Sequence, residues 1–580
     1  MDGCHTSISK QAAGHQPRLP KKLIVCCDGT WMDRDNGYKK GKLQNPSNVT
    51  RIARAMMSED DAKHPQIVYY QSGIGTGIGL YDQILGGGTG LGLSENIREA
   101  YGFLGTNYSP DDHLSGPDSI FLLGFSRGAF TARSLGGFIA AVGILTRKAM
   151  PFFYDAFLDW ENVGKDGYEP RFIDAYCAAN PDEKLDSKAN QPDPAIARSK
   201  KARAIDEYME QYKKHLLALG LTQEAQIKCV GVWDTVGALG IPVNPFIQAA
   251  GLPAFIKEYR WYDTRLSNVV ENAFQALALD ERRFPFSPAI WELDEAGTTN
   301  LRQVWFPGAH SNCGGSYQDY GVANITLVWL MDQLSGNTRP PNKLFDPLDW
   351  IKFDDDFINV CFRQTSNYYA KDSSGEDYNG WAMGKVYDSN TFPQFLTGSK
   401  VRTPGLYQKM DYNTGKNTGV PLKITNECIH SSVRARMDLA GRGVEPQEWY
   451  QRVASFFWRL ITFQKGPKMY HPQRTPRGRG LITLPGPLYG WELIDGHPSH
   501  DAPNMQIDMS PGGIKQVHWE YKGKAKCTTR VMKEDIFAER GYEERLLLHD
   551  QEIANKIIYS NNKWQWFKKP KMEHHWSKTF

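Results

Sequence analysis

The chain has 580 residues, more than one compact core usually holds, so we expect one large domain with insertions or two to three modules. Hydrophobic residues make up 41% and charged residues 23% of the chain, which argues against wholesale disorder. The 68 Lys and Arg nearly balance the 65 Asp and Glu, so a dedicated nucleic-acid-binding protein is not expected. The nine Cys form no CxxC pair, and neither a zinc site nor a disulfide framework is predicted.

The N-terminal residues 1–20 are polar and predict a flexible tail, with no apolar segment that would serve as a signal peptide. The longest smooth apolar stretch, residues 135–145, is too short and too rich in Gly to span a bilayer. We therefore expect a cytoplasmic protein.

Short apolar runs alternate with helical patterns through the first half of the chain. Each run ends in loop residues, which is typical of buried parallel strands. The runs lie at residues 23–27, 67–70, 120–123, 229–233 and 304–306. Helical patterns lie at residues 49–57, 95–104, 129–142 and 325–334, with Ser94 and Asn324 as expected N-caps. The alternation predicts an α/β domain over residues 21–340, with a mostly parallel sheet and helices on both faces.

Two further regions lack this alternation of apolar runs and helical patterns. Residues 146–221 predict a helical insertion with a charged, Pro-bearing loop. Residues 341–580 are rich in turns and predict an accessory C-terminal region, with helices expected over residues 449–461 and 532–558. The helix expected over residues 449–461 has an apolar stripe, and the tail after residue 562 carries Lys and Trp. Both features are compatible with a peripheral membrane contact. The ordinary alternatives are a core helix for the first feature and a frayed terminus for the second.

A G-x-S-x-G sequence, residues 124–128, directly follows one apolar run and directly precedes a helix of small residues. This strand–turn–helix context is typical of the nucleophile elbow of α/β-hydrolases, in which Ser126 is the nucleophile. The alternative is an ordinary turn that carries a solvated Ser.

A serine nucleophile needs a base, and the base needs an orienting carboxylate. In this fold class the chain order is Ser, then Asp or Glu, then His. Asp234 follows one apolar run and His310 follows another, so the order Ser126, Asp234, His310 fits, and all three residues are expected at strand ends.

The oxyanion of the tetrahedral intermediate needs preorganised N–H donors. The backbone N–H of Arg127 is expected to be one of them, because it follows the nucleophile. Gly29 or Thr30 is expected to supply the second, from the loop after the first strand, with Asp28 orienting that loop. As an alternative, Asp28 and Gly29 form a simple turn.

Five segments together resemble one known family: residues 27–31, 48–51, 124–129 and 232–237, and His310 before a Gly pair. This is an uncharacterised α/β-hydrolase domain family that includes the type VI secretion phospholipase effector catalytic domain and has many fungal members. The resemblance covers residues 21–340, and residues 402–407 and 430–434 are similar to its trailing region. It implies a serine esterase or lipase fold with Ser126, Asp234 and His310 at the triad positions.

The sequence departs from the family pattern at a few positions. The family often has His-Ser-Asp-Val-Gly-Gly-Gly-Tyr, where this chain has Asn312, Cys313 and Ser316, and Leu-Ser-Asp, where this chain has Val-Ala-Asn at residues 322–324. An acidic or ion-binding role of these positions is therefore not carried over, and phospholipase activity belongs to the secreted bacterial relatives.

The combined prediction is a serine hydrolase that acts on a small-molecule or lipid ester and needs no cofactor or metal. An acyltransferase or peptidase with the same triad, and a binding protein with a silent triad, remain alternatives. The Gly-rich residues 73–92 lack the Walker Lys, so they predict a loop bordering the site and no nucleotide cofactor. The sequence leaves the oligomeric state open.

The insertion is expected to emerge at the active-site end of the sheet and to cover the pocket as a cap. Its aromatic residues, among them Phe153, Phe157 and Trp160, are then placed to line an apolar wall that favours long acyl chains. The alternative is that these aromatic residues only form the insertion's own core.

Overall fold

The computed structural model describes a subset of the chain. The described residues are 18–29, 38–39, 42–43, 45–73, 90–110, 116–165, 167–183, 192, 202–236, 266–336, 348, 350–371, 380–389, 399–410, 417–438, 444–445, 486–495, 517–526, 530–535 and 541–549.

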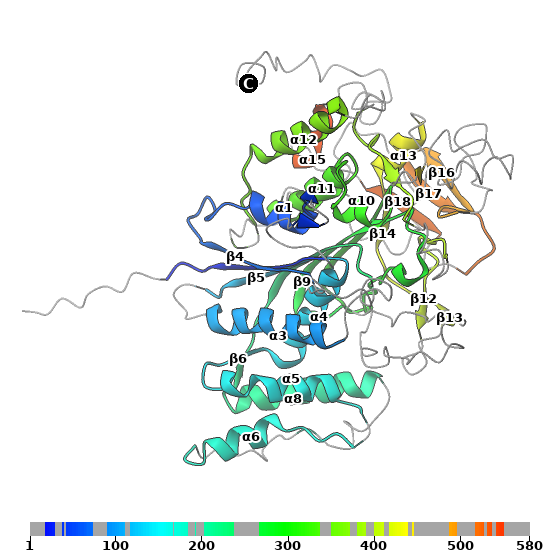
Figure 1. Cartoon of the computed structure of the whole chain (residues 1–580). Helices are drawn as coiled ribbons and strands as arrows, with labels where there is room; N and C mark the ends of the chain where they lie inside the picture. Colours follow the sequence, from blue (N-terminus) through cyan, green and yellow to red (C-terminus); the bar gives the residue numbers. More distant parts are fainter. Residues whose placement is uncertain are drawn as a thin grey trace, which may run out of the picture.

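One ten-stranded sheet forms the centre of the molecule (Figure 1). Its strands, in order across the sheet, are β16 (Trp491–Asp495), β17 (Val517–Tyr521), β18 (Val531–Asp535), β14 (Glu427–His430), β10 (Asn300–Phe306), β9 (Val270–Ala278), β8 (Ile227–Trp233), β5 (Ser119–Phe125), β1 (Lys22–Cys27) and β4 (Gln66–Gln71). Neighbouring strands from β18 to β4 are parallel, and β17 runs antiparallel to β16 and β18. All residues of β1 and β5 are buried, as strands covered on both faces should be.

Helices cover both faces of this sheet (Figure 1). On one face lie α3 (Gly90–Asn107) and α4 (Arg127–Val142), with α5 (Phe153–Asn162), α6 (Phe172–Ala179), α8 (Ala202–Ala218) and the 3-10 turn η1 (Met150–Phe152) packed beneath them. On the other face lie α1 (Asn48–Ala55), α10 (His310–Gly314), α11 (Ala323–Ser335), α12 (Phe357–Lys371), α13 (Ser431–Asp438) and α15 (Tyr542–Leu548). The fold is therefore α/β, of the α/β-hydrolase-like kind that the sequence predicted.

Short elements complete the described structure. The two-stranded pairs are β2 (Tyr38–Lys39) with β3 (Lys42–Leu43), β6 (Ile144–Leu145) with β7 (Thr222–Gln223), β11 (Val386–Tyr387) with β15 (Val444–Glu445), and β12 (Gln408–Met410) with β13 (Asn417–Pro421). A further 3-10 turn, η2 (Phe284–Phe286), lies between β9 and β10.

All five predicted strands and the four predicted helices of the first half are present. The two predicted caps are wrong, because Ser94 lies inside α3 and Asn324 lies inside α11. The helical prediction for residues 532–558 is wrong at its start, where residues 531–535 form β18, and right for α15. The predicted helix at 449–461, most of the Gly-rich segment 73–92 and the tail after 562 lie outside the described residues.

The predicted boundary at residue 340 does not interrupt the sheet. Strands β14, β16, β17 and β18 all come from the predicted C-terminal region, and they continue the sheet beyond β10. They enclose a core of their own that contains Trp305, Trp491 and Trp519. The division into domains at this boundary remains a prediction.

In the part of the chain that the structure describes, no helix combines the length and the apolar character needed to cross a bilayer. The same residues contain no group of three His, Cys, Asp or Glu side chains that could hold a metal ion.

Candidate active site

The three residues predicted from strand ends lie together at the carboxyl edge of the sheet. Ser126 directly follows β5, Asp234 directly follows β8, and His310 begins α10 shortly after β10. Strands β5 and β8 are neighbours, and only β9 separates β8 from β10. Because the carboxyl ends of parallel strands share one edge, residues 184 positions apart in the chain come into contact.

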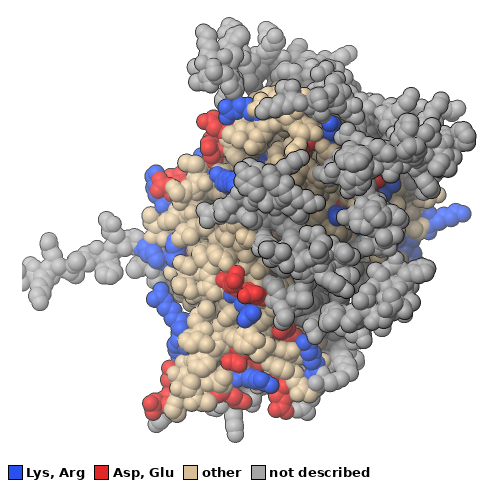
Figure 2. All heavy atoms as spheres, viewed as in Figure 1, with Lys and Arg blue, Asp and Glu red and all other residues tan. Residues whose placement is uncertain are grey.

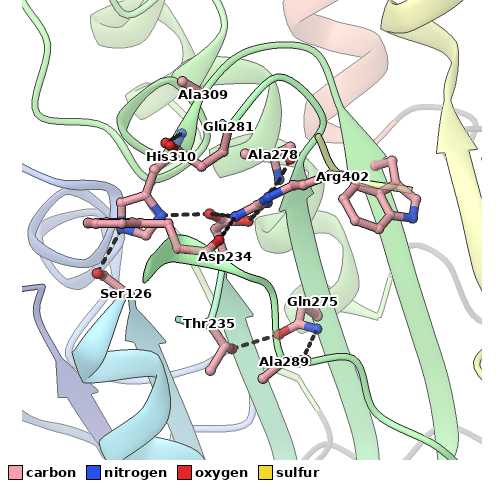
Figure 3. Close-up of polar contacts among 12 residues, drawn as sticks. Ser126, Asp234, Thr235, Gln275, Ala278, Glu281, Ala289, Ala309, His310 and Arg402 are labelled. Carbon is pink, nitrogen blue, oxygen red and sulfur yellow. Dashed lines mark hydrogen bonds and ion pairs between the residues drawn. The ribbon is translucent and has the colours of Figure 1, made fainter. Parts of the chain in front are cut away.

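A chain of hydrogen bonds connects the three side chains (Figure 3). The Ser126 hydroxyl lies 2.7 Å from His310 Nε2, and His310 Nδ1 lies 2.6 Å from Asp234 Oδ2. The exposed fractions of Ser126, Asp234 and His310 are 6%, 0% and 4%. This geometry fits a neutral imidazole that donates its Nδ1 proton to the carboxylate and accepts the hydroxyl proton at Nε2.

The charges around the site favour that protonation state. Burial lowers the pKa of His310, although the hydrogen bond and the charge of Asp234 act in the opposite direction. Burial alone would raise the pKa of Asp234, but the charge of Arg402 and the hydrogen bond from His310 outweigh it and hold this pKa below its usual range. Asp234 is therefore ionised, and His310 neutral, near neutral pH.

The backbone at Ser126 lies in an unusual conformation. Its φ is 59° and its ψ is −121°, in the region of positive φ that few non-glycine residues adopt. The flanking glycines permit the tight turn: a Cβ on Gly124 would collide with the backbone of Gly128 and Ala129, and one on Gly128 with the carbonyl oxygens of Cys27 and Asp28. The G-x-S-x-G sequence thus lets α4 leave β5 closely beside the end of β1.

The loop after β1 lies beside Ser126, because a Cβ on Gly29 would stand 3.4 Å from the Ser126 Cβ. Asp28 is buried, and its Oδ2 accepts hydrogen bonds from the hydroxyls of Ser47, Thr50 and Tyr70. Its Oδ1 accepts the backbone N–H of Gly29 at 2.6 Å, so this amide is already engaged.

The other expected oxyanion donors are Arg127 and Thr30. Arg127 is the first residue of α4, where backbone amides have no acceptor within the helix. Thr30 lies outside the described residues.

Arg402 contacts the site, and no sequence pattern indicated a role for it. Its guanidinium donates from Nη1 to Asp234 Oδ1 at 2.5 Å and from Nη2 to Oδ2 at 3.0 Å (Figure 3). It comes from a loop 168 residues after Asp234, and residues 402–407 had been noted only as similar to the family's trailing region.

Glu281 is a second residue that the sequence did not indicate. Its Oε2 accepts the backbone N–H of His310 at 3.1 Å, and its carboxylate also accepts hydrogen bonds from the Arg283 side chain and the Ser389 hydroxyl. Burial raises the pKa of Glu281, but Arg283 outweighs this effect and lowers the pKa to about 2. The ionised Glu281 therefore anchors the first turn of α10, on which His310 lies.

Residues 21–333, just over half of the chain, match the family described as "T6SS, Phospholipase effector Tle1-like, catalytic domain". The chain belongs to this family. Among curated proteins it is similar to the uncharacterized protein YEL023C of Saccharomyces cerevisiae, with 25% identity over 282 residues, which are 46% of this chain and 32% of the yeast protein.

The Tle1-like chain is also similar to two solved structures. One is an uncharacterized protein from Pseudomonas aeruginosa, with 16% identity, a TM-score of 0.30 and coverage of 53% of this chain and 44% of that one. The other is the Tle1 effector bound to the VgrG spike from the type 6 secretion system, with 22% identity, a TM-score of 0.25 and coverage of 55% and 56%. The chain thus spans about a third of the yeast relative and about half of each solved chain.

Two departures of this Tle1-like chain from the family pattern have local explanations. Asn312 accepts the N–H of Ala309 and donates to the carbonyl of Lys385. Asn324 donates to the Cys361 carbonyl and the Thr365 hydroxyl, and accepts from Arg51. An Asn side chain both donates and accepts, which an ionised Asp cannot do.

The described part of the insertion packs against α3 and α4. Phe157 is 2% exposed and contacts Phe138 of α4 with ring centroids 5.6 Å apart, and Phe153 stacks on Tyr101 of α3 at 4.9 Å. Trp160 packs against the same Phe138. These contacts place the aromatic residues in a core that the insertion shares with α3 and α4, and not in a core of the insertion alone. The cap remains a prediction, because most of residues 184–201 lie outside the described part.

Proposed function

We propose that this protein is a serine hydrolase that cleaves carboxylic esters through an acyl-enzyme, with Ser126, His310 and Asp234 as its triad. The hydrogen-bonded sequence Ser126–His310–Asp234 at the strand ends carries the proposal. Its support is geometric: a nucleophile within hydrogen-bonding distance of a base, and a base oriented by a third group.

In the proposed mechanism, Ser126 Oγ attacks the ester carbonyl carbon while His310 Nε2 takes the hydroxyl proton. Asp234 holds the Nδ1–H tautomer of His310 and stabilises the imidazolium. The tetrahedral intermediate collapses, His310 gives its proton to the leaving alcohol, and the acyl group stays on Ser126. A water molecule, deprotonated by His310, then hydrolyses the acyl-enzyme and restores the Ser126 hydroxyl.

The strained turn at Ser126 supports its assignment as a nucleophile elbow, since such turns expose the Ser oxygen beside helix amides. The proposed oxyanion donors are the backbone N–H of Arg127 and that of Thr30. Gly29 is the weaker choice for the second donor, because its N–H already donates to Asp28. The three hydroxyls bound to Asp28 support a role in holding this loop.

The proposed substrates are lipid esters, including phospholipids. The family description, a phospholipase effector catalytic domain, supports this substrate class. An acyltransferase would use the same acylation step and differ only in the acceptor that reaches the acyl-enzyme. A panel of p-nitrophenyl esters and phospholipids, assayed with and without added alcohol acceptors, separates these activities.

The test is labelling with a fluorophosphonate probe, which reacts with activated serines. The wild-type protein should be labelled and Ser126→Ala should not, and ester hydrolysis should fall by orders of magnitude in that variant. Ser134→Ala is the matched control, because Ser134 is a buried Ser on the same helix α4 and should leave labelling unchanged. Equal labelling of wild type and Ser126→Ala would overturn the proposal, and so would an unlabelled wild type.

A further inference from the structure

We propose that Arg402 is a positioning residue of the active site, which fixes the orientation and charge of Asp234 and thereby extends catalysis toward acidic pH. This inference rests on the proposed function, since it concerns the same site. Arg402 touches no reacting atom; it acts on His310 through Asp234.

The first argument is geometric. Asp234 Oδ1 accepts from Arg402 Nη1 and from the backbone N–H of Ala278, and Oδ2 accepts from Arg402 Nη2 and from His310 Nδ1. The carboxylate therefore has four donors and cannot rotate without breaking at least one bond. This two-pronged pairing is specific to the planar guanidinium, and a Lys ammonium cannot reproduce it.

The guanidinium is itself fixed. It donates from Nη1 to the carbonyl of Ala278 at 2.6 Å and from Nη2 to the carbonyl of Phe286 at 2.7 Å. Arg402 is 3% exposed and Asp234 is fully buried, so water does not screen their interaction. Arg402 thus connects the end of β9, the turn η2 and the carboxylate in one rigid arrangement.

The second argument concerns charge. A buried carboxylate without a cation takes up a proton more readily, and a protonated Asp234 would no longer hold His310 in the required tautomer. The positive charge of Arg402 prevents this protonation of Asp234. It also offsets the negative charge of the Asp234 carboxylate that acts on His310. Burial and the charge of Arg283 lower the pKa of His310, whereas Asp234 and the charge of Glu281 act in the opposite direction. Arg402 pairs with the Asp234 carboxylate, and we expect this pairing to limit the opposing effect of Asp234. The base therefore stays neutral, and active, at a lower pH than it would beside an uncompensated carboxylate.

The experiment measures the pH profile of kcat/KM for a p-nitrophenyl ester in wild type, Arg402→Met and Arg402→Lys. Metal sites lose about 10- to 100-fold in activity when a residue that orients a ligand is removed. Arg402 orients Asp234 in the same way, so Arg402→Met should lower kcat by about the same factor. It should also move the acid limb upward by about one pH unit or more, since a nearby opposite charge shifts a pKa by about 1–3 units. Arg402→Lys should give an intermediate kcat and a smaller shift, because it keeps the charge and loses the pairing geometry.

The matched control is Arg434→Met. Arg434 of α13 pairs with Glu534 of β18 through Nε and Nη2 at 2.8 and 2.7 Å, and both side chains are buried. This variant should lose as much stability as Arg402→Met and leave the acid limb where it is in the wild type. An unchanged acid limb in Arg402→Met would overturn the proposal.

A second measurement does not depend on the substrate or on catalysis. The Nδ1 proton of His310 should give a downfield NMR signal, and the His310 titration should have a higher midpoint in Arg402→Met than in wild type, with Arg402→Lys between the two. Identical midpoints would overturn the positioning role of Arg402. A protein that hydrolyses no ester but shows the shifted midpoint would instead overturn the proposed function alone.

Discussion

The ring of His310 lies between two aromatic rings that exclude water from it. The Phe125 centroid lies 4.6 Å from the His310 centroid, and the Phe286 ring packs edge-on at 4.9 Å. Such an apolar enclosure disfavours the charged imidazolium. The enclosure therefore acts in the same direction as Arg402, and together they set the pH at which the base loses its function.

The kcat/KM for ester hydrolysis should be constant near neutral pH and fall as the pH drops through the pKa of His310. Burial lowers this pKa, so the decline should be centred below about 6.5, the ordinary value for a His. Asp234 should not contribute, because its own pKa is also lowered. A pH series from about 4 to 8 locates the limb. A midpoint at or above the ordinary value would contradict the described environment of His310.

Gly128→Ala should distort the turn at Ser126. The added Cβ would overlap the carbonyl oxygens of Cys27 and Asp28, so we expect a loss of about 1–3 kcal/mol in the free energy of unfolding and a large fall in kcat. Gly137→Ala on the same helix is the control, since its Cβ would meet only Trp160 at 3.9 Å. That variant should gain about 0.5–1 kcal/mol, as Ala replaces Gly in a helix. Urea unfolding of both variants measures the difference; equal effects would contradict the steric argument.

The candidate site could be predicted only in part. Ser126, Asp234 and His310 were predictable because each follows an apolar run within a few residues and their chain order is that of the fold class. Arg402 and Glu281 were not, because a single Arg or Glu in a loop carries no local pattern. Their roles depend on which strand ends meet at the carboxyl edge, and that is a property of the folded sheet.

At the scale of single elements, strand β9 shows why the sheet was under-predicted. Its sequence VENAFQALA is rich in Ala and contains polar residues, which do not favour strand structure in isolation. Its buried Gln275 accepts from Thr235 and donates to the Gln303 side chain and the Ala289 carbonyl. These partners come from other segments, so the strand is stabilised by neighbours that local sequence cannot show.

The wrong helical prediction at residues 532–535 has a similar origin. Val531–Asp535 has two apolar residues followed by three charged ones, so its sequence has no alternation that would predict a strand. The pairing with β14 and β17 decides the outcome, and β14, which connects β18 to the parallel sheet, is far away in the sequence. Long apolar elements such as α11 were predicted correctly because burial on all sides is visible in composition alone.

The aromatic residues of α5 should act on stability rather than on substrate choice. Phe157→Ala should cost about 3–5 kcal/mol of unfolding free energy, because Phe157 is buried against Phe138 and Trp160. The dependence of kcat/KM on acyl-chain length should stay as in the wild type. Tyr154→Ala on the same helix is the control; Tyr154 is 52% exposed and should change stability little. A shift of Phe157→Ala toward short chains would instead support a cap lined by this residue.

At the scale of the whole molecule, the family match ends at residue 333, but the sheet does not. Arg402 reaches Asp234 from beyond the matched range, and β14 and β18 extend the sheet from there. Positive and negative side chains are interspersed over the described part of the face in Figure 2, in keeping with the near balance of charges in the sequence. The absence of a nucleic-acid partner remains a prediction.

Helix α15 connects the C-terminal part of the chain to the family domain, and one buried carboxylate holds its first turn. Asp332 of α11 accepts the backbone N–H groups of Tyr542 and Glu543 at 2.6 and 2.8 Å. These amides have no acceptor within the helix, so Asp332 caps α15 from another element. Glu543, held in this way, reaches His430 of β14.

Asp332→Ala should therefore release α15. Two buried amides would lose their acceptor, which we expect to cost about 2–4 kcal/mol of unfolding free energy. Asp355→Ala is the control, because Asp355 also contacts α15 from another segment. It pairs with Arg545 at 3.0 Å, but their side chains are 63% and 39% exposed, so its loss should cost less than about 1 kcal/mol. Urea unfolding measures both costs, and hydrogen exchange should show faster exchange at residues 541–549 in Asp332→Ala alone. Slow exchange there would mean that the C-terminal helix is held by its apolar contacts, among them the fully buried Leu547, and that the cap is dispensable.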